Sequence, residues 1–65
     1  MRANTKPVPS NFSVGDVLQG FGLNNAGRFY TVLAVSTSTR GRVQLEEHLT
    51  GRKFWTFDAY YRLSD

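Results

Sequence analysis

The chain has 65 residues, a formal net charge of +3 and no cysteine, so we expect one small domain without disulfides. These counts exclude a disulfide-stapled scaffold, a cysteine-based zinc finger and a thiol enzyme. No uncharged apolar run approaches the ~20 residues of a membrane span, and the N-terminus lacks the apolar segment of a secretory signal. We therefore expect a soluble, cytoplasmic protein with no membrane partner.

The charge of the chain is carried mostly by arginine, which supplies six of its eight basic residues against five acidic ones. Arginine forks match phosphate groups, and the pI of about 9.8 is in the range typical of nucleic-acid-binding domains. A small domain also needs a net charge of magnitude about 2–8 to stay soluble. The charge therefore favours nucleic acid as the partner, with solubility as the alternative explanation.

The first twelve residues differ in composition from the rest of the chain. They contain both prolines, Pro7 and Pro9, which cannot lie inside a helix and which remove backbone donors from a sheet. We predict a flexible basic arm over residues 1–12 and a folded domain over residues 13–65.

From Val14 onward, short β-prone segments alternate with turns rich in glycine. The strongest segment is 28–36, where aromatic and β-branched residues are dense. Alternation in segment 42–48 places Val43 and Leu45 on one face. The expected strands are 17–19, 28–36, 42–48, 52–57 and 61–63, with a loop over 20–27 and a 3₁₀ turn over 58–60.

Several short motifs together indicate a fold. They are Gly15-Asp16-Val17, Tyr30-Thr31-Val32, Val43-Gln44-Leu45, Thr50-Gly51, Phe54-Trp55-Thr56-Phe57 and Arg62-Leu63. With the order of the elements, they make residues 14–64 resemble the SH3-like small β-barrels. The resemblance implies an all-β domain with a five-stranded barrel and a 3₁₀ turn before the last strand. In that superfamily the long first loop often lines a binding surface. A barrel also encloses a core with few apolar residues and hides most strand edges.

A second set of motifs is Pro9-Ser10-Asn11, Gly15-Asp16, Thr50-Gly51 and the aromatic strand that follows. In these the chain resembles the plasmid-borne type II dihydrofolate reductases, which are SH3-like barrels of similar length that assemble as a ring. That family's active surface is carried by a Val-Gln-Ile-Tyr stretch, where this chain has Phe54-Trp55-Thr56-Phe57. The glutamine and the tyrosine are missing, so the catalytic part of the resemblance fails.

Groups suited to catalysis or metal binding are sparse. His48 is the single histidine, and no second histidine or cysteine completes a metal site. We expect no catalytic residue, no metal ligand and no cofactor, and we predict that the chain is not an enzyme. An oligomeric enzyme like the type II dihydrofolate reductases is the third alternative.

Aromatic residues are the most informative feature, with five Phe, three Tyr and one Trp. Segments 28–36 and 52–57 carry rings on both faces, because side chains alternate along a strand. A core of this size holds about four or five rings, so the others face water or a partner. The expected core consists of Tyr30, Val32, Val43, Leu45, Phe57 and Leu63, with Trp55 left open.

The remaining rings and the nearby basic residues form the candidate binding surface. Rings beside arginines stack on bases and neutralise the backbone of single-stranded nucleic acid. The same pairing is typical of a protein–protein hot spot, and burial in a homo-oligomer is a third alternative. At Arg40-Gly41-Arg42 the two arginines either grip phosphates or form an ordinary charged turn. The candidate residues are Arg28, Arg40, Arg42, Arg52, Lys53, Phe54, Phe21 and Phe29.

These features predict a small non-enzymatic binding module for nucleic acid or a nucleic-acid-associated protein. The alternative is an accessory protein of the phage or plasmid type that binds and modulates a host protein, an analogy drawn from size alone.

Overall fold

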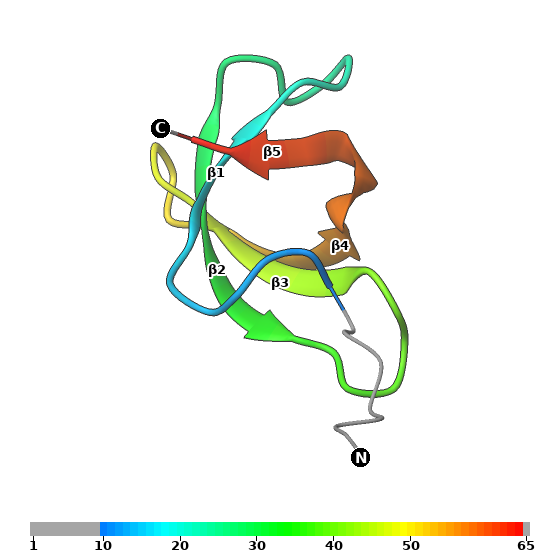
Figure 1. The fold of residues 1–65 in the computed structure, drawn as a ribbon. Helices are drawn as coiled ribbons and strands as arrows, with labels where there is room; N and C mark the ends of the chain where they lie inside the picture. The colour runs from blue at the N-terminus through cyan, green and yellow to red at the C-terminus, as the bar shows by residue number, and fades with distance from the viewer. Residues whose placement is uncertain (1–9, 65) are drawn as a thin grey trace.

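The computed structural model describes residues 10–64, which form one sheet of five antiparallel strands (Figure 1). The strands are β1 (Val17–Gly20), β2 (Phe29–Val35), β3 (Arg42–Glu47), β4 (Lys53–Phe57) and β5 (Tyr61–Leu63). A 3₁₀ turn, η1 (Asp58–Tyr60), lies between β4 and β5. The predicted strands and the turn are confirmed, and no bound differs by more than one residue.

The strands lie in the order β4-β3-β2-β1-β5, so β4 and β5 are the two edges of the sheet. The sheet curls strongly, and η1 brings the chain from the end of β4 back to β5 (Figure 1). Within residues 10–64, no hydrogen-bonded ladder joins β4 to β5. The predicted all-β, five-stranded domain is therefore confirmed, whereas closure of the sheet into a barrel is not observed.

A β-bulge in β2 changes which side chains face the core. Val32 pairs with Leu45 and Ala34 pairs with Gln44, so Leu33 is an extra residue between them. Strict alternation would leave Val35 on the solvent face, but the extra residue reverses the faces beyond it. Val35 accordingly packs against the core.

The core lies on the concave side of the curled sheet. Its buried residues are Leu18, Tyr30, Val32, Val43, Leu45 and Tyr61. Four of these were predicted, whereas the expected burial of Phe57 and Leu63 is wrong, since they are 47% and 53% exposed. In β4 it is Phe54 that packs against the core, so alternation turns Phe57 outward. Leu63 is exposed because it ends a three-residue edge strand.

The fold extends into the segment that the sequence assigned to the arm. Ser10 is buried, and its hydroxyl donates to the carboxylate of Asp58 at 2.6 Å. The N–H of Phe12 donates to the Ser10 hydroxyl at 3.2 Å, and the Phe12 ring packs against the core. Residues 10–12 therefore contact the sheet, while residues 1–9 of the predicted arm lie outside the described residues.

Candidate functional site

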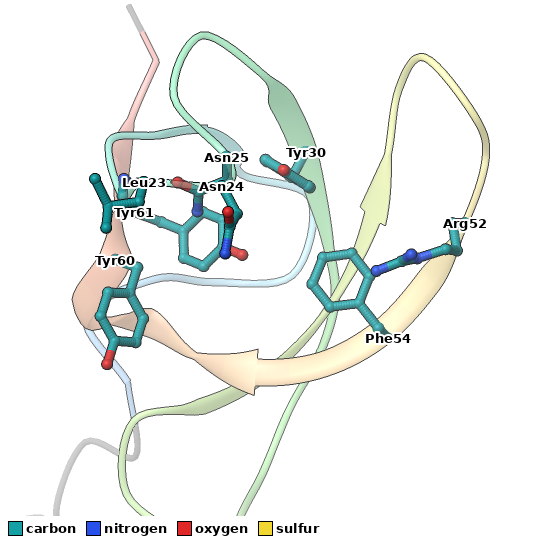
Figure 2. Close-up of a pocket in the computed structure, with 9 residues that line it drawn as sticks. Leu23, Asn24, Asn25, Tyr30, Arg52, Phe54, Tyr60 and Tyr61 are labelled. Atoms are coloured by element: carbon teal, nitrogen blue, oxygen red, sulfur yellow. Dashed lines mark hydrogen bonds between the residues drawn. The ribbon is translucent and has the colours of Figure 1, made fainter.

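A groove of about 560 Å³ lies between the loop after β1, η1 and the start of β4. Figure 2 shows loop residues and two tyrosines on one side of it, with Phe54 and Arg52 on the other. These elements are far apart in the sequence, and the curl of the sheet brings them together. The lining residues are Gly22, Leu23, Asn24, Asn25, Tyr30, Arg52, Phe54, Tyr60 and Tyr61.

The loop wall of the groove is held in place by short-range contacts. The side-chain oxygen of Asn25 accepts a hydrogen bond from the N–H of Gly22 at 2.6 Å. The loop packs so closely on the end of β1 that a Cβ atom on Gly20 would lie 2.4 Å from the carbonyl oxygen of Asn25. The N–H of Phe21 donates to the carbonyl of Tyr60 at 3.2 Å, which ties the loop to η1. The wall is thus fixed from both sides.

The floor and rim of the groove are aromatic. The ring of Tyr30 makes edge-to-face contacts with Phe54, at a centroid distance of 5.8 Å, and with Tyr61, at 5.1 Å. Tyr60 stands at the rim and is 57% exposed. Burial raises the pKa of the Tyr30 hydroxyl, and Tyr61 and Glu47 nearby raise it further. The hydroxyl therefore stays protonated at neutral pH and is a donor as well as an acceptor.

Two arginines border the groove, and they differ in their partners. Arg28 forms a salt bridge with Glu47, which is nearly buried and also accepts a hydrogen bond from the Thr50 hydroxyl at 2.9 Å. The bonds from Arg28 and Thr50 hold the pKa of the Glu47 carboxyl below its usual range. Arg52 makes no salt bridge within residues 10–64, and its guanidinium carbon lies 5.2 Å from the ring centroid of Phe54. Arg52 is thus an exposed cation with no carboxylate in direct contact among the described residues.

A second arginine–aromatic cluster lies on the convex side of the sheet. The guanidinium of Arg42 lies 5.7 Å from the ring centroid of Trp55 and 5.9 Å from that of Phe57. Trp55 is 42% exposed, and Lys53 is exposed on the same side of the strand. We call Arg42, Lys53, Trp55 and Phe57 the outer β4 face.

The structure divides the predicted binding residues between these two places. Arg52 and Phe54 line the groove, and Arg28 borders it. Arg42 and Lys53 belong to the outer β4 face. The division follows from the antiparallel hairpin, which puts Arg42 at the opposite end of β3 from Arg52, and from alternation along β4.

The remaining predicted residues line neither the groove nor the outer β4 face. Phe21 and Phe29 are exposed, and Arg40 is exposed in the turn between β2 and β3. Phe29 lines a smaller hollow, of about 380 Å³, that it shares with His48. His48 is hydrogen-bonded to the Thr31 hydroxyl at 2.6 Å, so this imidazole has a structural partner outside the groove.

Sequence reasoning did not select the residues that line most of the groove. Asn24 and Asn25 were not selected, Tyr60 and Tyr61 were counted only among the rings left outside the core, and Tyr30 was placed in the core without a role in binding. The available signal was the combination of a long first loop containing two asparagines with two adjacent tyrosines in the turn before the last strand. The SH3-like resemblance pointed to that loop but not to its partner across the groove.

Residues 10–64 hold no group of three His, Asp or Glu side chains close enough to bind a metal ion. In the same part of the chain, no helix is long and apolar enough to cross a membrane.

Comparisons with protein-family models, with curated proteins and with solved structures give no match for this chain.

Proposed function

We propose that the domain binds single-stranded nucleic acid in the groove, with a base against its rings and the backbone near Arg52. The observation that carries this proposal is the presence, in one hollow, of four aromatic rings and a guanidinium without a carboxylate partner among residues 10–64. Aromatic side chains bind unpaired bases by stacking, and basic groups beside them neutralise phosphates. A duplex offers no free base face, which favours a single strand.

The dimensions of the groove suit one nucleotide unit. Its volume of about 560 Å³ lies within the roughly 300–1,000 Å³ typical of pockets for small ligands. Tyr60 offers an exposed ring at the rim, and the exposed Asn24 offers an amide with donors and an acceptor for a base edge. Ring stacking together with an amide matches the way in which proteins hold unstacked bases.

The charge around the groove predicts a moderate dependence on salt. Arg52 is the cation of the lining and forms no salt bridge among residues 10–64, whereas Arg28 already has Glu47 as its partner. Each phosphate that is neutralised contributes about one unit to the slope of affinity against salt on logarithmic axes. We therefore expect a shallow slope with one main contributor.

A protein partner is the competing proposal, because rings and an arginine also make a protein–protein hot spot. The SH3-like resemblance supports a binding role for the loop wall without choosing between a nucleic acid and a peptide. An accessory protein that modulates a host protein would use the same groove. Binding of a peptide through rings should respond little to salt, which separates the two proposals.

The test is a titration of labelled single-stranded and double-stranded oligonucleotides with the full chain, followed by fluorescence anisotropy. We expect the single strand to bind more tightly than the duplex. Arg52→Gln should weaken binding and reduce the salt slope by about one unit. Tyr60→Ala should cost about 1–3 kcal/mol of binding through lost stacking.

Arg62→Gln is the matched control, because Arg62 is exposed on β5 and does not line the groove. It removes the same charge and should leave the affinity nearly unchanged. Equal losses of affinity in Arg52→Gln and Arg62→Gln would show that binding depends only on overall charge, which would contradict the proposal. If the wild-type chain binds neither oligonucleotide, a protein partner becomes the better explanation of the groove. An assay with NADPH and dihydrofolate tests the reductase alternative, and we expect no turnover.

A further inference from the structure

Among residues 10–64, the edge strand β4 has a row of backbone groups without a strand partner. The hydrogen-bonding pattern of the β3–β4 ladder shows which groups these are. At one end the N–H of Glu47 donates to the carbonyl of Arg52 at 2.8 Å. At the other end the N–H of Asp58 donates to the carbonyl of Gly41 at 2.7 Å. Backbone groups in an antiparallel ladder alternate between facing the partner strand and facing away. The residues of β4 whose N–H and C=O groups face away from β3 are therefore Lys53, Trp55 and Phe57.

The two edges of the sheet differ in how well they are protected. Edge strands are normally blunted by short length, charge, proline or a bulge. The edge strand β5 has three residues, and Arg62 is exposed at its centre. The edge strand β4 has five residues, continuous pairing with β3 and two large exposed rings, at Trp55 and Phe57. Its single charge is Lys53, at its first position.

We propose that two copies of this chain pair through their β4 strands, antiparallel, around a two-fold axis at Trp55. In this register Lys53 of one copy lies opposite Phe57 of the second copy, and the two Trp55 residues lie opposite each other. This alignment matches every outward backbone group of β4 with a group on the other copy, and each such pair exchanges two hydrogen bonds. Shifting either strand by two residues leaves outward groups unmatched. The two sheets then join into one continuous sheet.

The side chains of the outer β4 face suit this register. Opposite residues of an antiparallel pair project from the same side of the sheet, so the Lys53 ammonium meets the Phe57 ring of the second copy. The two lysines are kept apart, which avoids a like-charge contact. Within each copy, Glu46 lies beside Lys53 on β3 and Arg42 lies beside Phe57. Across the interface, four side chains therefore lie side by side on the same face of the joined sheet. In order, they are Glu46 and Lys53 of one copy, then Phe57 and Arg42 of the second copy.

This pairing is independent of the proposed groove function. Phe54 and Arg52 line the concave side of β4, whereas the pairing uses its outer edge and the outer β4 face. Loss of one activity is therefore expected without loss of the other.

The first test measures the mass of the full chain by sedimentation over a range of concentrations. We expect a monomer–dimer equilibrium, and a blue shift in the fluorescence of Trp55, the single tryptophan, as the dimer forms. Trp55→Lys places two ammonium groups opposite each other and should raise the dissociation constant by about 30-fold or more. The matched control is Leu49→Lys, at a residue that is 84% exposed outside β4, and it should dimerise like the wild type. A wild type that stays monomeric, or a Trp55→Lys variant that dimerises equally well, would overturn the proposal.

The second test fixes the register and uses the absence of native cysteine. Lys53→Cys and Phe57→Cys variants, each alone, have no second thiol across the proposed interface. Mixed with a short bifunctional thiol reagent, they should form a covalently linked heterodimer, because a hydrogen-bonded antiparallel pair holds opposite Cβ atoms about 5.5 Å apart, somewhat wider than a disulfide spans. Cross-linking of Lys53→Cys with itself, or no cross-link in the mixture at concentrations where the wild type is dimeric, would contradict the register and with it the proposal.

Discussion

The groove and the outer β4 face contain the same kinds of residue and differ in what surrounds them. Each has an arginine guanidinium within about 6 Å of an aromatic ring, as cation–π contacts require. In the groove, Phe54 packs against the core and forms a hollow with the tyrosines of η1 and β5. On the outer β4 face, Trp55 and Phe57 lie on an edge strand whose outward backbone groups have no strand partner among residues 10–64. A hollow suits a small flat ligand, whereas an edge suits a second strand.

The comparison shows that the parity of residues along β4 decides which surface a ring joins. Phe54 points to the concave side and Trp55, its neighbour, points to the convex side. Composition alone gives an aromatic, basic strand, and only the direction of each side chain separates the proposed ligand groove from the proposed pairing edge.

The largest effect is expected when the free energy of unfolding of Phe54→Ala is compared with that of Phe57→Ala. Removing the Phe54 ring leaves a gap against Tyr30 and should cost about 2–3 kcal/mol, less than for a fully buried phenylalanine because Phe54 is half-buried. The melting temperature should fall by roughly 10–20 °C. Phe57→Ala should cost about 1 kcal/mol or less.

Both melts are measured at low concentration, where the chain is monomeric, because dimerisation would add its own stability. Equal losses in the two variants would show that the two sides of β4 are supported in the same way, contrary to the comparison.

A smaller effect is expected at Gly20, where a substitution displaces the loop wall of the groove without changing the outer β4 face. In Gly20→Ala the new Cβ would meet the backbone of Asn25, so the loop must move, at a cost of about 1–2 kcal/mol. Oligonucleotide binding should weaken while dimerisation stays unchanged. Ala26→Ser is the control, because Ala26 is exposed in the same loop and does not line the groove. Unchanged oligonucleotide binding in Gly20→Ala would count against the loop as a wall of the site.

The smallest effect concerns pH and the Arg28–Glu47 pair beside the groove. The pKa of Glu47 is lowered in the folded state, first by the hydrogen bond from Arg28 and then by that from Thr50. Its contribution to stability is therefore present above the unfolded value of about 4.3 and is lost as pH falls through the lower folded value. The difference in melting temperature between the wild type and Glu47→Gln should be constant near neutral pH and shrink below pH about 4. A difference that grows on acidification would contradict the assigned shift.

Much of the fold was predictable because local chemistry determines it. Glycine marked the turn at Thr50-Gly51, and dense β-branched and aromatic residues marked β2. The error at Phe57 had a physical cause, since the alternation of β4 offers two faces with rings on both and no local rule chooses between them. The bulge at Leu33 likewise depends on pairing with β3.

The groove was less predictable because its members become neighbours only through the curl of the sheet. Asn24 and Tyr60 are 36 residues apart in the sequence, and no short motif links them. Arg52 and Phe54 were identified because rings beside arginines are visible in the sequence itself. The same criterion also selected Arg42 and Lys53, which belong to the other surface.

The most direct test of the central claim, that the groove is the nucleic-acid site and the outer β4 face is not, is a two-dimensional NMR titration with a single-stranded oligonucleotide. The full chain is held at a concentration where it is monomeric. We expect the amide signals of residues 22–25 and 60–61 and the Arg52 side-chain signal to shift together in a saturable way. The indole N–H signal of Trp55 should stay in place. Saturable shifts at Trp55 and Phe57 with unchanged groove signals would contradict the account.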